Sequence, residues 1–146
     1  MKKPKTILIV EDNKADVFLM REAIEAAELG AEIHVVSDGD EAFEFIDRAD
    51  ADDAAPCPSL FIVDLNLPKR SGLEVLEHLR KSRKCFKAIV LIATSSDSVP
   101  ERNQAKKLGT NGYFRKPSNY DDYLKLGEVV GTLLGASEAA EDSGGG

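Results

Sequence analysis

Two apolar segments of strand length each end in carboxylates, and these carboxylates are the residues best suited to chemistry. Asp64 follows the apolar run 60–63, while Glu11 and Asp12 follow the apolar run 7–10. Open α/β sheets place their active groups at the carboxyl ends of buried strands. If these two strands are neighbours, three carboxylates converge and repel one another unless a cation binds. Oxygen ligands of this kind suit Mg²⁺.

Two later strand-like segments also end in polar side chains, Thr94 and Lys116. The chemistry that uses such a set is phosphoryl transfer to a carboxylate, with Asp64 as the nucleophile. Mg²⁺ held by Asp12, Asp64 and a backbone carbonyl just after Asp64 would neutralise the phosphoryl oxygens. Lys116 would offer a second, movable positive charge, and Thr94 a hydroxyl donor.

Apolar runs of strand length alternate with helical patterns along the chain. The predicted strands span 6–10, 33–36, 60–63, 88–93 and 112–114; the predicted helices span 14–27, 71–83, 100–108 and 119–134, with one more from about residue 40. Five βα units predict a flavodoxin-like, doubly wound α/β fold: five parallel strands in the order 2-1-3-4-5 and five helices. In that order the first, third, fourth and fifth strands adjoin, so their polar ends can meet in one crevice.

The chain is expected to form one domain over residues 1–134, with no output domain to bind DNA or act as an enzyme. Residues 135–146 end in Ser-Gly-Gly-Gly and are expected to be a disordered tail. The segment 47–59 is acidic, alanine-rich and broken by two prolines, so it is predicted to be a solvated loop with a frayed helix end. Phe18 is among the residues predicted to face the core from the first helix.

Composition excludes several classes of function. The formal net charge of −7 at pH 7 argues against nucleic-acid binding, which needs a basic surface. No apolar run approaches the ~20 residues of a membrane span, and no signal peptide is recognisable. Cys57 and Cys85 lack metal-ligand spacing, so both are expected to be free thiols in a reducing cytoplasm.

The whole constellation resembles the receiver domain of two-component response regulators. The matching motifs are Glu11-Asp12-Asn13, Asp64 with Asn66-Leu67-Pro68 and Gly72, Thr94-Ser95, and Tyr113-Phe114-Arg115-Lys116-Pro117. They occur in the right order and at the right positions in the alternation of strands and helices. The resemblance covers about residues 5–134.

The resemblance implies a role for each acid of the cluster. Asp64 would be the phosphoacceptor. Asp12 would bind Mg²⁺ directly, Glu11 would act through water, and Asn66 would supply its main-chain carbonyl to the metal.

The resemblance also implies roles around the cluster. Thr94 and Tyr113 resemble the pair that couples phosphorylation to a rearrangement of the surface. Lys116 looks like the family's lysine, and Lys116–Pro117 like the bond that the family holds in cis. A cis bond before proline would cost ~0.5–1 kcal/mol.

A narrower resemblance is to the small stand-alone regulators that are paired with phytochrome-type histidine kinases. It lies in Ala15-Asp16 after the first acids, in Asp64-Leu65-Asn66-Leu67-Pro68, and in Thr94-Ser95-Ser96. The expected partners are a histidine kinase, a downstream protein bound by the fourth helix, fifth strand and fifth helix, and a second copy of the chain. Such a protein is a cytoplasmic switch rather than an enzyme, with slow loss of its own phosphate.

Three other functions use similar residues or the same fold. A haloacid-dehalogenase-type phosphatase needs a second acid two residues after its nucleophile, where this chain has Asn66; turnover of a phosphate ester would favour it. A flavin carrier needs a phosphate loop rich in Ser, Thr and Gly, where this chain has Glu11-Asp12-Asn13; a coloured protein would favour it. A pseudo-receiver that only binds partners would fail to take up phosphate, but the intact set of acids, threonine and lysine argues against it.

Overall fold

The computed structural model describes residues 5–144, and the side chains of residues 5–135. Its strands are β1 (Thr6–Val10), β2 (Glu32–Val36), β3 (Leu60–Val63), β4 (Ile89–Thr94) and β5 (Gly112–Arg115). Its helices are α1 (Lys14–Ala26), α2 (Gly39–Ala51), α3 (Gly72–Arg80), α4 (Val99–Lys107), α5 (Tyr120–Tyr123) and α6 (Lys125–Gly144). Among the described residues, no helix has both the length and the apolar character needed to cross a bilayer.

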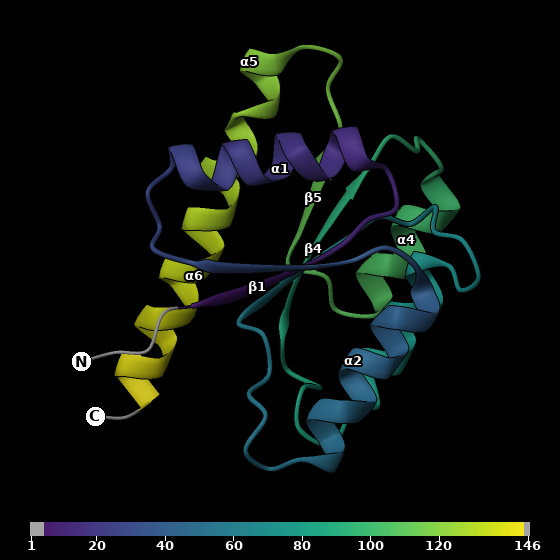
Figure 1. The fold of residues 1–146 in the computed structure, drawn as a ribbon, viewed down its shortest axis with the longest axis vertical. Helices are drawn as coiled ribbons and strands as arrows, with labels where there is room; N and C mark the ends of the chain where they lie inside the picture. Colours follow the sequence, from purple (N-terminus) through teal and green to yellow (C-terminus); the bar gives the residue numbers. More distant parts are fainter. Residues whose placement is uncertain (1–4, 145–146) are drawn as a thin grey trace.

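The strands form one parallel sheet in the order β2-β1-β3-β4-β5, so the predicted flavodoxin-like topology is confirmed (Figure 1). The register pairs Val10 with Val63, and Glu11 and Asp64 therefore leave neighbouring strands at the same level. At the ends of the other two strands, β4 and β5, the backbone N–H of Lys116 donates to the Thr94 carbonyl at 2.9 Å. The register of the sheet thus brings the polar strand ends to one edge.

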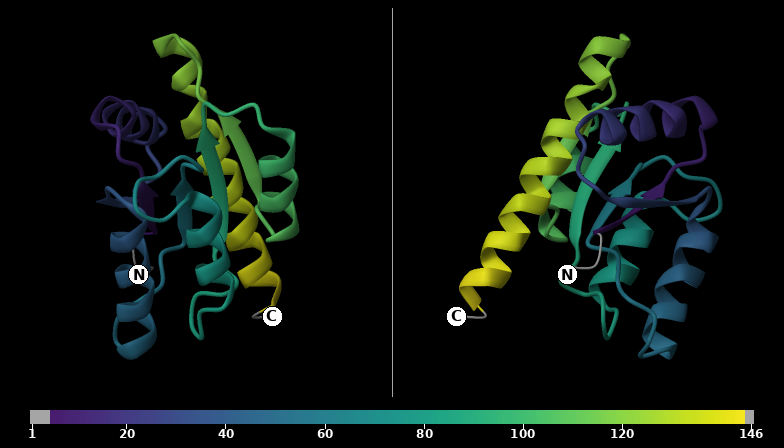
Figure 2. Two further views of the ribbon diagram at one scale, coloured as in Figure 1. Left: turned by 90° about the vertical axis from the view of Figure 1, so that its right-hand side faces the viewer. Right: turned by 60° about the vertical axis from the view of Figure 1, so that its left-hand side comes forward.

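Helices cover both faces of the sheet, and alternate strand residues point to opposite layers (Figure 2). Ile7 and Ile9 of β1 pack in the layer that contains α1, α5 and α6. Leu8 and Val10 pack in the layer that contains α2, α3 and α4. Burial on both faces explains why these strands read as continuous apolar runs rather than as alternating ones.

Three helical details differ from the sequence predictions. Helix α2 is regular to Ala51, where a frayed helix end and a loop were predicted from residue 47; Ala49 packs into the core and stabilises this last turn. The last helix is divided at Leu124 into α5 and α6. Phe18 is 59 % exposed, because it lies beside the stripe formed by Met20 and Ile24 rather than on it.

Helix α6 also extends to Gly144, where the sequence predicted disorder from residue 135 (Figure 2). Alanine and glutamate fill much of this stretch, and both are strong helix formers. The prediction of disorder gave more weight to the acidic residues and the final glycines than to this helix propensity. Residues 145–146 of the predicted tail lie outside the described residues.

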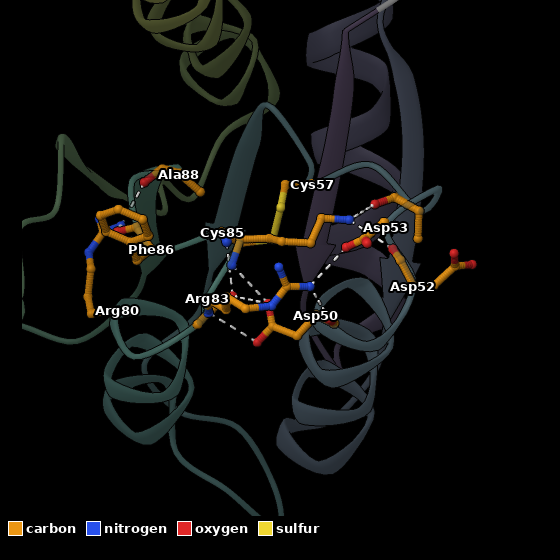
Figure 3. Close-up of a disulfide and its surroundings, with 12 residues drawn as sticks. Asp50, Asp52, Asp53, Cys57, Arg80, Arg83, Cys85, Phe86 and Ala88 are labelled. Carbon is orange, nitrogen blue, oxygen red and sulfur yellow. Dashed lines mark hydrogen bonds and ion pairs between the residues drawn. A yellow bond between two sulfur atoms is a disulfide. The ribbon is translucent and has the colours of Figure 1, made fainter.

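The expectation of two free thiols was wrong, because Cys57 and Cys85 form a disulfide with a Cα–Cα distance of 5.6 Å (Figure 3). The two residues are 28 positions apart in sequence. Cys57 shortly precedes Leu60 and Cys85 shortly precedes Ile89, and these two residues pair in register. Adjacent parallel strands therefore bring the cysteines together at the amino edge of the sheet, opposite the carboxylate edge.

Polar contacts join the same two segments around the disulfide (Figure 3). The Asp50 carboxylate accepts from the Ser82 hydroxyl at 2.7 Å and from the Lys84 backbone N–H at 3.0 Å. The Arg83 guanidinium donates to the Asp50 carbonyl at 2.6 Å and to Asp53 at 3.1 Å. The end of α2 and the loop before β3 are therefore fixed to the loop before β4 by covalent and polar links.

Removing the disulfide should destabilise the protein without disturbing the carboxylate edge. We expect the double variant Cys57→Ala/Cys85→Ala to lose about 3–4 kcal/mol of unfolding free energy, since the closed loop no longer restrains the unfolded chain. Urea denaturation measures this loss, and dithiothreitol should affect only the parent protein. An unchanged urea midpoint in fully reduced parent protein, with both thiols counted, would contradict the prediction.

Candidate metal centre

Three carboxylates meet at the carboxyl edge of the sheet. Glu11 and Asp12 follow β1 and Asp64 follows β3, and one oxygen of each lies within 4.8 Å of the others. Glu11 is 1 % exposed and Asp64 5 %, whereas Asp12 is open to solvent. The cluster thus has a buried floor and one accessible side, through which an ion could enter.

The Lys116 ammonium is the counter-charge of this cluster. Its Nζ lies 2.6 Å from Glu11 Oε1, 2.8 Å from Asp64 Oδ2 and 2.9 Å from Asp16 Oδ2. Burial alone would lower the pKa of Lys116, but its bonds to Asp64, Glu11 and Asp16 outweigh burial and raise the pKa. Lys116 therefore stays protonated, with carboxylates around its head group.

Glu11 is the least satisfied member of the cluster. Its Oε2 accepts from the Asn13 backbone N–H at 3.1 Å, but Oε1 is buried and makes no hydrogen bond of good geometry, although it lies close to Lys116. Burial raises the pKa of Glu11 to about 7, against the lowering effect of Lys116. A buried carboxylate oxygen that makes no well-aligned hydrogen bond favours a nearby cation.

The donor set fits a hard divalent ion. Three carboxylates with an open side offer oxygen ligands of the kind that hard divalent ions take in proteins, usually together with water. Asn66 does not join the cluster with its side chain, which is exposed; its backbone N–H donates to Asp64 Oδ1 at 3.0 Å. That bond keeps the loop after β3 folded against the Asp64 carboxylate.

Gly72 also positions this loop. It begins α3, and a Cβ at this position would overlap the Asp64 carbonyl and the Leu65 backbone. Its N–H donates to the Leu65 carbonyl at 3.0 Å. Ser71 and Glu74 close a capping box at the same helix end. Only glycine allows α3 to start this close to the residue that carries the candidate nucleophile.

Thr94 and Tyr113 meet the loop after β4 rather than the carboxylates. Thr94 is fully buried, and its Oγ1 accepts from the Ser96 backbone N–H at 3.2 Å. The Tyr113 hydroxyl donates to the Ser96 carbonyl at 3.0 Å, and the Arg102 guanidinium lies 4.5 Å from the centre of its ring. Both predicted switch residues are therefore linked through Ser96.

The Lys116–Pro117 bond is trans, since the described residues contain no cis peptide bond, and the predicted cis bond was wrong. Trans is the lower-energy isomer before proline. Lys116 reaches its three carboxylates without the cis form.

Asp16 belongs to the site, although no chemical role was predicted for it. It lies in the first turn of α1, where Oδ2 contacts Lys116 and Oδ1 accepts from the Tyr123 hydroxyl at 3.0 Å. Burial raises the pKa of Tyr123, and the Asp16 charge raises it further, so the phenol remains a donor. The signal that could have found Asp16 is its place in the first turn of the helix that follows Glu11 and Asp12.

Comparisons with known proteins agree with this geometry. Residues 7–126 match the family model described as the response regulator receiver domain. Response regulator Rcp1 of Synechocystis sp. is 32% identical over 123 residues, which cover 84% of this chain and 84% of Rcp1.

Solved structures of response regulators also superpose on this chain. The phosphorylated cyanobacterial phytochrome response regulator RcpA superposes with a TM-score of 0.81 at 29% identity, over 90% of this chain and 95% of that chain. The Mn²⁺-bound form of Rcp1 superposes with a TM-score of 0.80 at 31% identity, with the same coverage of 90% and 95%.

Proposed function

The chain belongs to the response regulator receiver domain family, and from that premise we propose that it is a switch phosphorylated on Asp64 by a histidine kinase. The observation that carries the proposal is the convergence of the Glu11, Asp12 and Asp64 carboxylates with the Lys116 ammonium at one edge of the sheet. Glu11, Asp12 and Asp64, with the Asn66 main-chain carbonyl, would hold Mg²⁺.

In the transfer, a carboxylate oxygen of Asp64 forms a bond to phosphorus as the bond from phosphorus to the kinase histidine nitrogen breaks. The imidazole keeps the bonding electron pair and takes up a proton. Bound Mg²⁺ would neutralise charge on the phosphoryl oxygens. Lys116 supplies a protonated donor beside the acceptor carboxylate, and the buried cluster limits competing water.

The new charge on Asp64 would then reorganise the loop after β4. Thr94 and Tyr113 both bond to Ser96, so movement of that loop would be passed to the surface of α4, β5 and the predicted fifth helix, which comprises α5 and the first part of α6. Turning a mostly inactive population into a mostly active one requires a preference of ~5.5 kcal/mol for the active state. A phosphoryl group facing lysine and a divalent ion in a crevice can supply a preference of that size.

The partners follow from the same proposal. The description of RcpA as a cyanobacterial phytochrome response regulator favours a phytochrome-type histidine kinase as the donor. The output would pass by contact to a downstream protein or to a second copy of the chain, and Asp64 phosphate would hydrolyse slowly by itself. The protein would work in the cytoplasm with its kinase. Disulfides are rare in the cytoplasm, where Cys57 and Cys85 would be expected as free thiols. Counting the free thiols of protein whose cysteines are alkylated at the moment of cell lysis therefore tests the proposed location.

Phosphorylation with a small donor tests the proposal. With acetyl phosphate and Mg²⁺, the protein should gain one phosphoryl group that is lost in hydroxylamine, and peptide mass spectrometry should place it on Asp64. Addition of EDTA should prevent the reaction, and Mg²⁺ in excess should restore it. Absence of label from both acetyl phosphate and a panel of histidine kinases would overturn the proposal, as would label on another residue.

A further inference from the structure

Lys116 is held by one carboxylate that does not belong to the acid cluster. An ammonium group has three N–H donors, and Lys116 has three carboxylate partners. Glu11 and Asp64 are both candidate ligands of the divalent ion, whereas Asp16 is not in that group. When an ion engages Glu11 and Asp64, the contact to Asp16 is the one that remains to direct the ammonium.

Asp16 is itself fixed from the opposite side. Its Oδ1 accepts from the Tyr123 hydroxyl, while Oδ2 faces Lys116. Tyr123 is 2 % exposed, and its ring packs edge-on against Phe114, with the ring centres 5.9 Å apart. Helix α5 and strand β5 therefore hold the phenol in place, and the phenol holds the carboxylate.

We propose that Asp16 is a positioning residue: anchored by Tyr123, it keeps the Lys116 ammonium aimed at Asp64 when a divalent ion occupies the cluster. This inference rests on the proposed function and adds a residue to it. Asp16 is not part of the acid cluster that would hold the ion. It acts through Lys116, whose side chain is long and would otherwise have several orientations available.

The chain offers a matched control for this arrangement. The Tyr120 hydroxyl donates to Glu22 at 2.6 Å, and this pair also joins α5 to α1 through a phenol and a carboxylate. Neither residue contacts Lys116 in the described structure. If the Asp16–Tyr123 contact mattered only because it links α1 to α5, loss of the Glu22–Tyr120 contact would slow phosphorylation to a similar extent.

The test compares four variants with the parent protein. At saturating Mg²⁺, Asp16→Asn should slow phosphorylation by acetyl phosphate about tenfold, because a misplaced Lys116 no longer meets the incoming group. Tyr123→Phe keeps every charge and the buried ring, and should slow the reaction about threefold. Glu22→Gln and Tyr120→Phe should react at the parent rate.

A binding measurement provides a readout apart from the reaction. Calorimetric titration with Mg²⁺ should give weaker binding to Asp16→Asn, because Lys116 then competes more strongly for Glu11 and Asp64. Tyr123→Phe should bind Mg²⁺ as the parent does, since its charges are unchanged. Thermal unfolding shows whether each variant is folded. If Asp16→Asn does not fold, the phosphorylation rate of Tyr123→Phe tests the positioning role instead.

The outcomes separate this inference from the proposed function. Parent-like rates for both Asp16→Asn and Tyr123→Phe in a protein that does phosphorylate would overturn the positioning role alone. Equal slowing by Glu22→Gln would also overturn it, since the effect would then come from the helix tie. Failure of the parent protein to take up phosphate would instead refute the proposed function.

Discussion

Phosphoryl uptake should disappear when Asp64 is replaced by Asn, while the fold persists. The amide has the shape of the carboxylate but no anionic oxygen to attack phosphorus, so we expect a loss of at least about a thousandfold in the rate with acetyl phosphate. Asp64 lies in the acid cluster beside Lys116 and is 5 % exposed, whereas Glu11, which also contacts Lys116, is still more deeply buried at 1 %. The measurement is incorporation of phosphate, followed by intact mass.

The same substitution should not destabilise the metal-free protein. It removes one of three acids that surround Lys116, while Glu11 and Asp16 remain to pair with the ammonium. We therefore expect the unfolding free energy to change by less than about 1 kcal/mol. Asp53→Asn is a suitable control, because Asp53 is an exposed acid at the opposite edge of the sheet. Phosphate uptake by Asp64→Asn at the rate of that control would show that the nucleophile lies elsewhere.

The fold was predictable because its strands are buried on both faces. The bounds of β1 and β3 are those predicted, since an apolar run bordered by polar residues marks a buried parallel strand clearly. The edge strand β2 is less apolar, and its start was predicted one residue late, after Glu32. Topology then placed Glu11, Asp64 and Lys116 at one edge without any knowledge of side-chain positions.

The contacts of Asp16 could not be read in the same way. Its partners Lys116 and Tyr123 are 100 and 107 positions away, and one of them lies on a short helix that the sequence joined to the next. Its place in the first turn of α1 also gives it an ordinary alternative role, because acids favour helix N-termini. Only the packing of α5 against α1 reveals that it faces Lys116.

The disulfide was missed because the prediction considered only the separation of the two cysteines in sequence, and not the pairing of the strands that follow them. A spacing of 28 residues matches no metal motif and no small disulfide framework. The predicted strand order did contain the required information, since the third and fourth strands are neighbours and each follows one cysteine closely. Combining strand register with cysteine position would have predicted the pairing.

The second large effect is expected from Lys116→Met, which removes the charge and keeps most of the side-chain volume. Glu11 and Asp64 are almost fully buried, and burial raises the pKa of Glu11 even with Lys116 beside it. Loss of the ammonium leaves these acids without compensation. We expect the metal-free variant to lose about 3–5 kcal/mol of unfolding free energy at pH 8. Lys125→Met, at an exposed lysine that pairs with Asp122, should lose almost none.

Protons and metal should each restore part of that loss. The usual pKa of Glu11 is 4.5 and its pKa in the folded protein is about 7, so the folded state binds more protons than the unfolded state between these values. Stability contributed by this group therefore rises as pH falls from 8 to 6. Without Lys116 the pKa of Glu11 should rise further, so acidification should stabilise Lys116→Met more than the parent.

Mg²⁺ should act in the same direction, because in the parent protein the ion competes with the ammonium for Glu11 and Asp64. A ligand stabilises the folded state in proportion to the logarithm of its concentration over its dissociation constant. The rise in melting temperature with Mg²⁺ should thus be larger in Lys116→Met than in the parent or in Lys125→Met. Equal rises in all three proteins would mean that Lys116 and the ion do not share ligands, and that the acid cluster is no metal site.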